Sequence, residues 1–329
     1  MLDTGAQDRT GHRARVFTAR SVDASQHASL AKGWDLTFAQ WSPGRFNGAL
    51  AAVQLDRMQI LRDQTNRSLS KQGTAWPGSL VFSLPMGASG DGRLAGRTLS
   101  FPSGLLANAG NLPELRTPEQ LDLVCVAVDR GWLSDMADAS GCALAARRIR
   151  TTPNRLHGLP STNQRLFQSF EDIFGNLPEL AQTLEHHASR VALESLVADL
   201  LLEALSTGEG DDLRACPPHK RVVDKARAYV MDNMDRQPTI DDVCRHLGVS
   251  RRKLQNCFHQ TLGCSPAQFL RVMRLNGVRR ALQNPGQTSP VSVGDVAAHW
   301  GFWHLSRFAG DYRDLFGELP SETLRRARA

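Results

Sequence analysis

The side chains between residues 251 and 259 combine hydrogen-bonding groups with a regular apolar spacing. Arg252 can donate two parallel hydrogen bonds to a guanine, and Gln255 and Asn256 can pair in the same way with an adenine. Apolar side chains return at every fourth position, which places them on one buried face of a helix, at Leu254, Phe258 and Leu262. The polar side chains are left on the opposite face, so the pattern predicts a helix that contacts base edges in the major groove of duplex DNA.

A second stretch with the same spacing follows further along the chain, at Phe308, Tyr312 and Phe316. Its free face is poorer in groups that can bond to bases, because it carries Ala309 and Gly310. We therefore expect the first helix to supply most of the base specificity. The residues expected to contact DNA in the two stretches are Arg251, Arg252, Gln255, Asn256, His304, Ser306, Arg307 and Arg313.

Each of these helices follows a shorter one, which gives two helix-turn-helix units, at residues 239–262 and 292–316. Thr239 and Ser292 can cap the shorter helices, each with an aspartate three residues on, a variant of the capping box. Gly248 and Gly301 stand where the shorter helix must end and the chain must turn sharply, which favours a residue that tolerates positive φ. The repeat therefore predicts two separate contacts with DNA.

A long helix is predicted between the two units, opened by Ser265 and Pro266 and closed at residues 284–286. Its eighteen residues, at a rise of about 1.5 Å each, span roughly 27 Å. With the width of the units added, this length can set the two recognition helices about one turn of DNA apart, roughly 34 Å. Its arginines are expected to contact phosphates or water rather than bases, namely Arg271, Arg274, Arg279 and Arg280.

The net charge of +6 is unevenly distributed over the 329 residues. Residues 217–329 carry +8 and the remainder carries −2, as expected of a chain with a nucleic-acid-binding segment. The six cysteines show neither a CxxC pair nor the spacing of a disulfide framework. No signal peptide opens the chain and no apolar run approaches a membrane span. We therefore expect a cytoplasmic protein with reduced thiols, associated with the nucleoid and not with a membrane.

Residues 15–130 predict a compact β barrel or sandwich, since short apolar runs alternate with turn-forming clusters at about ten-residue spacing. The aromatic residues of this part form either a pocket or ordinary core, and core packing explains most of them at least as well. The pocket hypothesis, for a small-molecule effector, rests first on Arg45, Phe46 and Trp76. The other residues that could line the barrel interior are Trp34, Phe38, Trp41 and Phe82. Residues 161–206 predict helices with an apolar stripe that either packs on the β domain or forms a dimer interface, at Leu193, Leu196, Val197, Leu200 and Ala204.

These segments predict two domains joined by a linker. Residues 15–206 form a β-rich sensor and dimerisation domain, and residues 219–325 form the DNA-binding domain. Residues 207–218 are polar and bear Pro and Gly, which is typical of a flexible connection.

Several residues of the two units follow a known family pattern. In the second unit they are Gly301-Phe302, Phe308, Tyr312, Phe316-Gly317 and Pro320-Ser321, and in the first unit they run from Ser250 to Leu254. The segment 219–325 resembles the AraC/XylS family of transcriptional regulators. The resemblance implies an α+β fold, with an N-terminal cupin-like β barrel, a helical segment for homodimerisation and an all-α C-terminal domain with two helix-turn-helix units. It also implies an activator that binds promoter or operator DNA, recruits RNA polymerase and responds to a small-molecule effector.

A narrower likeness lies in residues 250–259, 274–280 and 300–305. These segments look like the branch of the family that contains the ethanolamine-utilisation operon regulator, and residues 43–48 and 55–62 match that branch more loosely. This likeness does not carry over the identity of the effector, the target operon or the operator sequence.

Two other classes of protein are weighed against a regulator. A DNA-alkylation repair enzyme fused to such a domain needs a four-cysteine zinc site, but residues 1–215 hold only Cys125 and Cys142. His186 and His187 are adjacent on a helix, so they point about 100° apart and do not chelate together. We therefore expect no enzyme activity, no metal and no cofactor. The alternative of a ligand-independent architectural DNA-binding protein is disfavoured by the long N-terminal domain.

Overall fold

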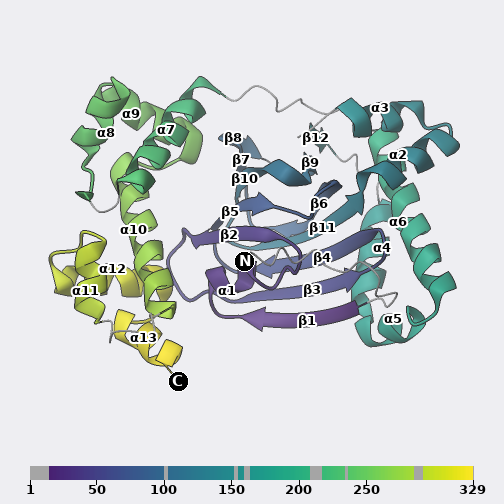
Figure 1. Ribbon diagram of the computed structural model, residues 1–329, viewed down its shortest axis with the longest axis horizontal. Helices are drawn as coiled ribbons and strands as arrows, with labels where there is room; N and C mark the ends of the chain where they lie inside the picture. The colour runs from purple at the N-terminus through teal and green to yellow at the C-terminus, as the bar shows by residue number, and fades with distance from the viewer. Residues whose placement is uncertain are drawn as a thin grey trace, which may run out of the picture.

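The computed structural model describes residues 15–99, 103–151, 155–158, 164–207, 217–233, 236–284 and 292–328. Two β-sheets occupy the middle of the molecule, with one group of helices on each side (Figure 1). The N-terminal part is rich in strands and the C-terminal part is all helical, so the α+β class predicted from the sequence is confirmed. No helix in these ranges is both long enough and apolar enough to cross a membrane.

The larger sheet has seven strands. In spatial order they are β1 (Arg15–Ser21), β3 (Gly48–Gln54), β4 (Met58–Thr65), β11 (Leu121–Asp129), β6 (Ser79–Ala88), β9 (Ser103–Asn108) and β12 (Arg155–Gly158). The smaller sheet has five strands, in the order β2 (Asp35–Gln40), β5 (Leu69–Thr74), β10 (Leu112–Arg116), β7 (Gly92–Leu94) and β8 (Arg97–Leu99). Neighbouring strands in both sheets are antiparallel.

The N-terminal domain is not a closed barrel. Within the described strands, no backbone pairing joins the five-stranded sheet to the seven-stranded sheet, so the two remain separate. The sheets face each other, and residues of both line a cavity between them. The sequence pattern cannot make this distinction, because short strands at regular spacing are typical of barrels and sandwiches alike.

Helices cover the outer face of the seven-stranded sheet (Figure 1). They are α2 (Arg130–Ala139), α3 (Ala143–Thr151), α4 (Gln164–Gly175), α5 (Leu177–Thr183) and α6 (His187–Thr207). The apolar stripe of α6 packs into the core beneath them, since Val197, Leu200 and Ala204 are buried. Leu196 is an exception at 46% exposure. The stripe therefore serves mainly the packing of the β domain, which was one of the two predicted alternatives.

The C-terminal helices share a single hydrophobic core. They are α7 (Pro218–Asp232), α8 (Ile240–Leu247), α9 (Arg251–Leu262), α10 (Pro266–Gln283), α11 (Val293–His299), α12 (Leu305–Phe316) and α13 (Pro320–Arg328). The long helix predicted between the units is confirmed as α10. The predicted linker lies, apart from Thr207, Pro217 and Pro218, outside the described residues.

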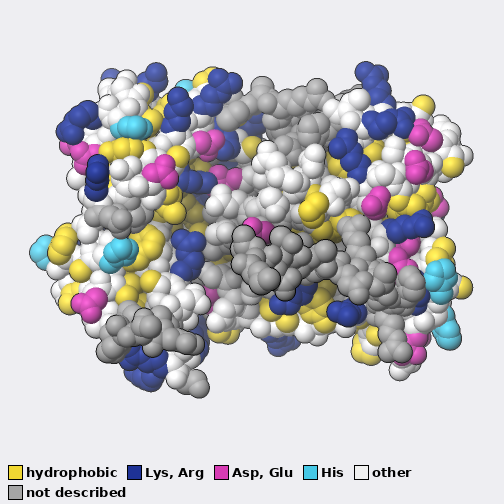
Figure 2. All heavy atoms as spheres, viewed as in Figure 1, with side chains coloured by type: hydrophobic (Ala, Val, Ile, Leu, Met, Phe, Trp, Pro, Cys, Tyr) yellow, Lys and Arg dark blue, Asp and Glu magenta, His cyan; other side chains and the backbone are white. Residues whose placement is uncertain are grey.

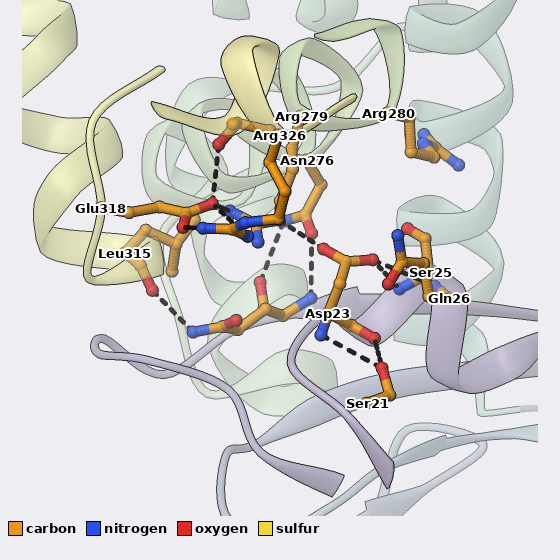
Figure 3. A network of polar contacts seen from close by, with 12 residues as sticks. Ser21, Asp23, Ser25, Gln26, Asn276, Arg279, Arg280, Leu315, Glu318 and Arg326 are labelled. Carbon is orange, nitrogen blue, oxygen red and sulfur yellow. Dashed lines mark hydrogen bonds and ion pairs between the residues drawn. The ribbon is translucent and has the colours of Figure 1, made fainter. Parts of the chain in front are cut away.

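The two domains contact each other directly through polar and apolar side chains. Trp41 of the N-terminal domain is buried in the core of the C-terminal helices. Arg279 of α10 forms a buried ion pair with Asp23, which caps the short helix α1 (Ala24–Ala28) (Figure 3). Gln40 and Asn276 exchange two hydrogen bonds of 2.9 Å. The orientation of the DNA-binding helices is therefore fixed by the β domain as well as by their own core.

Candidate nucleic-acid interface

The first helix-turn-helix unit is built by local hydrogen bonds that follow its sequence. Thr239 Oγ1 accepts from the Asp242 N–H at 3.2 Å, and the Asp242 carboxylate accepts from the Thr239 N–H at 2.9 Å. The predicted capping box at the start of α8 is thus confirmed. Gly248 ends α8 at φ 64°, a left-handed conformation that side chains disfavour. Ser250 then caps the recognition helix α9 by accepting from the Lys253 N–H.

The second unit repeats this plan with a weaker start to its recognition helix. Ser292 Oγ accepts from the Asp295 N–H at 3.0 Å, and Gly301 has φ 79°, as both were predicted to do. The residue that precedes α12 is His304, whose side chain makes no capping hydrogen bond. Because Ser, Thr, Asp and Asn are the favoured capping residues, α12 has a less firmly bonded first turn than α9.

The structure places all of the predicted DNA-contacting side chains at the surface. Those of α9 and its partner helix α12 are exposed: Arg251, Arg252, Gln255, Asn256, His304, Ser306, Arg307 and Arg313. The apolar residues interleaved with them are buried, as the spacing predicts: Leu254, Phe258, Phe308 and Tyr312. Figure 2 shows Lys and Arg side chains gathered at the upper left, where Figure 1 places α8 and α9. The first unit thus presents a polar, basic face to solvent.

Arg251 differs from its neighbours because it already has a partner. Its guanidinium forms an ion pair with Asp241 of α8, and both side chains are more than half exposed. The hydrogen bond from Arg251 lowers the pKa of the Asp241 carboxyl below its ordinary value. An exposed pair of this kind contributes little to stability, so a DNA phosphate can compete with Asp241 for this arginine.

The arginines of α10 do not behave as one group. The expectation that Arg279 contacts phosphate or water is wrong, since the residue is 6% exposed and pairs with Asp23 and Glu318. Arg274 donates to the Pro238 carbonyl at 3.0 Å, and burial lowers its pKa. Arg271 forms an ion pair with Asp311 of α12. These side chains hold the helices in place, a role that cannot be seen without the tertiary structure.

Two apolar side chains beside α12 are exposed. Trp303 was not among the predicted contacts, whereas Leu305 was predicted either to touch a thymine methyl group or to pack locally. Trp303 is 71% exposed and Leu305 is 52% exposed. They follow the turn at Gly301 directly, and neither position belongs to the buried spacing of four in α12. The start of α12 therefore presents two large apolar side chains to solvent, next to the residues predicted to contact DNA.

The three residues predicted to line an effector pocket lie in different places. Arg45 is exposed beside a surface hollow that it shares with residues of α13. Phe46 is buried next to α1, edge-on to the His27 ring. Trp76 packs in a small cluster with Ala75 and its neighbours. None of the three is among the residues that line the cavity between the two sheets.

That cavity has a volume of about 90 Å³ and is mostly apolar. Its walls include Trp34, Leu36, Phe38, Leu50, Leu61, Val81, Leu105, Leu115 and Leu123. A polar cluster stands in the same wall: Lys71 Nζ lies 2.6 Å from Asp63 Oδ2, and His27 Nε2 lies 2.9 Å from Asp63 Oδ1. Burial would raise the pKa of Asp63, but Lys71 and His27 hold it below the ordinary value, so the carboxylate stays charged.

Comparison with known proteins agrees with the paired units. The fold and the exposed recognition helices define a helix-turn-helix DNA-binding domain, and a family profile described as "Helix-turn-helix domain" matches residues 243–326. The "XylDLEGF operon transcriptional activator 2" of Pseudomonas putida is 35% identical over 131 residues, which are 39% of this chain and 80% of that protein. The chain belongs to the AraC/XylS family.

Other relatives are longer than the region they share with this chain. The "XylDLEGF operon transcriptional activator 3" of Pseudomonas putida is 29% identical over 177 residues, 52% of each protein. The chain thus spans about half the length of these longer curated relatives, or somewhat less. Among solved structures, the AraC-like transcriptional activator CuxR is 17% identical, over 87% of this chain and all of that one, with a TM-score of 0.41. A score this low adds nothing to the description of the fold.

Proposed function

We propose that this chain is a sequence-specific DNA-binding transcriptional regulator, an activator, whose two units contact adjacent major grooves of promoter or operator DNA. The observation that carries the proposal is the pair of capped units in which every predicted DNA-contacting side chain is exposed. The names of the relatives, two of them transcriptional activators, support it. The 18-residue helix α10 joins the units with a span of roughly 27 Å, compatible with successive grooves.

Within this proposal the two units have different tasks. Arg252, Gln255 and Asn256 of α9 contact bases, because their side chains can form paired hydrogen bonds with purines. The second unit contacts phosphates and isolated base edges and recognises the shape of the groove, and Arg251 of the first unit acts in the same way. The residues with this role are Arg251, His304, Ser306, Arg307 and Arg313. A helix with a weaker cap and fewer bidentate groups suits this second role.

Replacing Arg252 by alanine is expected to weaken binding to the operator by about 1–3 kcal/mol and to relax specificity at one base pair. Fluorescence anisotropy with an operator obtained by selecting genomic fragments, and with its single-base variants, measures both effects. Arg325→Ala in α13 removes the same charge from an exposed position outside the recognition helices and serves as the control. An equal loss of affinity on random DNA would show that Arg252 contacts the backbone and not a base.

The cavity between the sheets is the proposed site for the effector. Lys71 is 8% exposed, donates a hydrogen bond to Asp63 and lies 4.8 Å from the Phe38 ring, although an ammonium group has three N–H donors. The apolar walls and this donor fit a small, mainly apolar molecule with one oxygen acceptor. A cofactor is not part of the proposal, and neither is enzyme activity.

A compound that binds in the cavity is expected to raise the melting temperature of the chain. At a ligand concentration a hundredfold above Kd, binding adds about 2.7 kcal/mol to the free energy of unfolding. Thermal shift with single-ring phenols, amides and carboxylates detects it. Lys71→Met removes the donor and should abolish the shift, whereas Lys32→Met, at an exposed position nearby, should retain it. A shift of the same size in both variants would place the compound elsewhere.

Three further elements of the proposal concern partners and location. Val191 and Leu196 of α6 are 44% and 46% exposed, which supports a homodimer through this helix. RNA polymerase is the partner that an activator requires, and the cytoplasm, at the nucleoid, is where the activator meets its DNA.

Membership of the branch that contains the ethanolamine-utilisation regulator is proposed from residues 250–259, 274–280 and 300–305 alone. An architectural protein without a ligand is the second candidate, and the apolar cavity with its buried lysine argues against it.

A further inference from the structure

The five-stranded sheet lies between the cavity and the DNA-binding helices. On β10, Leu115 lines the cavity, while its neighbours Glu114 and Arg116 contact the C-terminal domain. Glu114 Oε1 accepts from Arg227 Nη2 at 2.6 Å, and Arg116 Nη1 donates to the Leu262 carbonyl at 2.5 Å. Because successive side chains of a strand point to opposite faces, one strand touches both.

Strand β2 also contacts both the cavity and the C-terminal domain. Leu36 and Phe38 line the cavity, and Gln40, at the end of the strand, is bonded to the C-terminal domain. The Gln40 N–H donates to Asn276 Oδ1, and its side-chain Nε2 donates to the Leu315 carbonyl at 2.6 Å. A shift of β2 relative to the seven-stranded sheet would therefore disturb hydrogen bonds to both α10 and α12.

The contacts from this sheet and from the loop that follows β2 end on the last turns of the two recognition helices. At α9, Arg93 Nη1 donates to the Gln260 carbonyl at 2.8 Å, beside the bond from Arg116 to Leu262. At α12, the Gly44 N–H lies 3.0 Å from the Asp314 carbonyl, beside the bond from Gln40 to Leu315. Carbonyls in the last turn lack partners within the helix and carry the negative end of its dipole, so these donors hold both helix ends.

The two walls of the cavity are held in different ways on their outer faces. The seven-stranded sheet is fixed on its outer side by the core that it shares with α2 to α6. The outer side of the five-stranded sheet is bonded to the C-terminal domain by Arg227, Arg116 and Arg93, and Trp41, which follows β2, is buried in the core of that domain. The cavity volume of about 90 Å³ is well below the roughly 300 Å³ or more of typical ligand pockets, so an effector that fills a typical pocket would displace the walls.

We propose that the five-stranded sheet is a movable wall, whose displacement by a ligand in the cavity shifts the C-terminal ends of α9 and α12 and so changes the relative placement of the two recognition helices. The ion pair between Lys71 of this sheet and Asp63 of the other is the tie that a ligand oxygen loosens. This inference rests on the proposed effector site and describes how that site regulates DNA binding.

Overfilling the cavity by mutation tests the coupling without effector or DNA. Leu61 and Ile60 are adjacent on β4 and both buried, but Leu61 faces the cavity and Ile60 faces the core shared with the helices. Leu61→Phe should push on the five-stranded sheet, whereas Ile60→Phe overpacks the other side. The amides of Gln40 and Gly44 donate across the domain interface, so their hydrogen exchange reports its opening.

In the full chain, Leu61→Phe is expected to speed exchange of these two amides on the order of tenfold, with Ile60→Phe close to the wild type. If Leu61→Phe folds incompletely, Ala31→Val, a smaller intrusion into the same cavity, should give the same direction of change. Unchanged exchange in the cavity variants, or an equal rise in Ile60→Phe, overturns the movable wall. Failure to find an effector or an operator would instead count against the proposed function and would leave this result as it stands.

Discussion

Replacing Arg279 by alanine is expected to lower the free energy of unfolding by about 3–5 kcal/mol, because it leaves buried carboxylates without their partner. Arg279 Nε lies 2.5 Å from Asp23 Oδ2, and Nη1 lies 3.0 Å from Glu318 Oε1. All three residues are at most 7% exposed (Figure 3). The measurement is urea denaturation followed by circular dichroism. Arg280→Ala, next in sequence and half-buried, should cost less than about 1 kcal/mol.

The loss in Arg279→Ala should depend on pH in a direction that identifies its cause. Burial would raise the pKa of Asp23, but the charge of Arg279 and its hydrogen bond hold that pKa below 3.8. In the wild type, the lowered pKa of Asp23 adds to the free energy of unfolding at pH values above the pKa of this carboxyl in the unfolded chain. That contribution is lost as the pH falls through its pKa in the folded chain. Without Arg279, burial raises the pKa of Asp23, so the deficit should be largest at neutral pH and shrink toward pH about 4.

A deficit that does not change with pH would mean that Arg279 stabilises the fold by packing its guanidinium on the Phe316 ring, 4.6 Å away, and not by its charge. The double variant Asp23→Asn with Arg279→Met distinguishes the two further. It removes both charges, so it should recover part of the loss if an unpaired carboxylate is the cause.

Those parts of the fold that depend on local chemistry could be predicted from the sequence. The capping residues Thr239 and Ser292, the turn glycine Gly248 and the full length of α10 are each encoded within a few neighbouring residues. The exposure of the recognition faces followed from the apolar spacing alone. These features hold because helix boundaries and amphipathic faces depend mainly on short-range interactions.

Contacts between distant segments could not be predicted in this way. Gln40, Asn276 and Arg279 are polar, and polar residues outside a motif are ordinarily assigned to the surface. Gly277 is a similar case, since a Cβ there would lie 2.1 Å from the Trp300 ring. The glycine permits α10 and the second unit to approach closely, but a glycine inside a helical sequence pattern does not by itself predict such a contact. The prediction of a cupin-like barrel was wrong about closure for the same reason, because closure depends on pairing between strands that are far apart in the chain.

Replacing Trp41 by alanine is expected to lower the free energy of unfolding by about 3–5 kcal/mol, although the residue lies outside the domain whose core it fills. Its ring is 8% exposed, 5.8 Å from the Phe269 ring, and the Arg116 guanidinium stands 4.0 Å above it. Loss of the ring leaves a cavity against Phe269 and removes the surface on which Arg116 rests. Denaturant unfolding of the full chain measures the effect.

Trp303→Ala is the matched control, since it removes the same side chain from a position that is 71% exposed. It should leave stability within about 0.5 kcal/mol of the wild type and act on DNA binding instead. If Trp41→Ala also leaves stability unchanged, the C-terminal helices fold without the β domain. The interface is then a contact between two domains that fold independently. If the loss is as large as expected, the two domains share one folding unit. Any signal from the cavity would then reach the recognition helices by a shift of packed elements and not by release of a free domain.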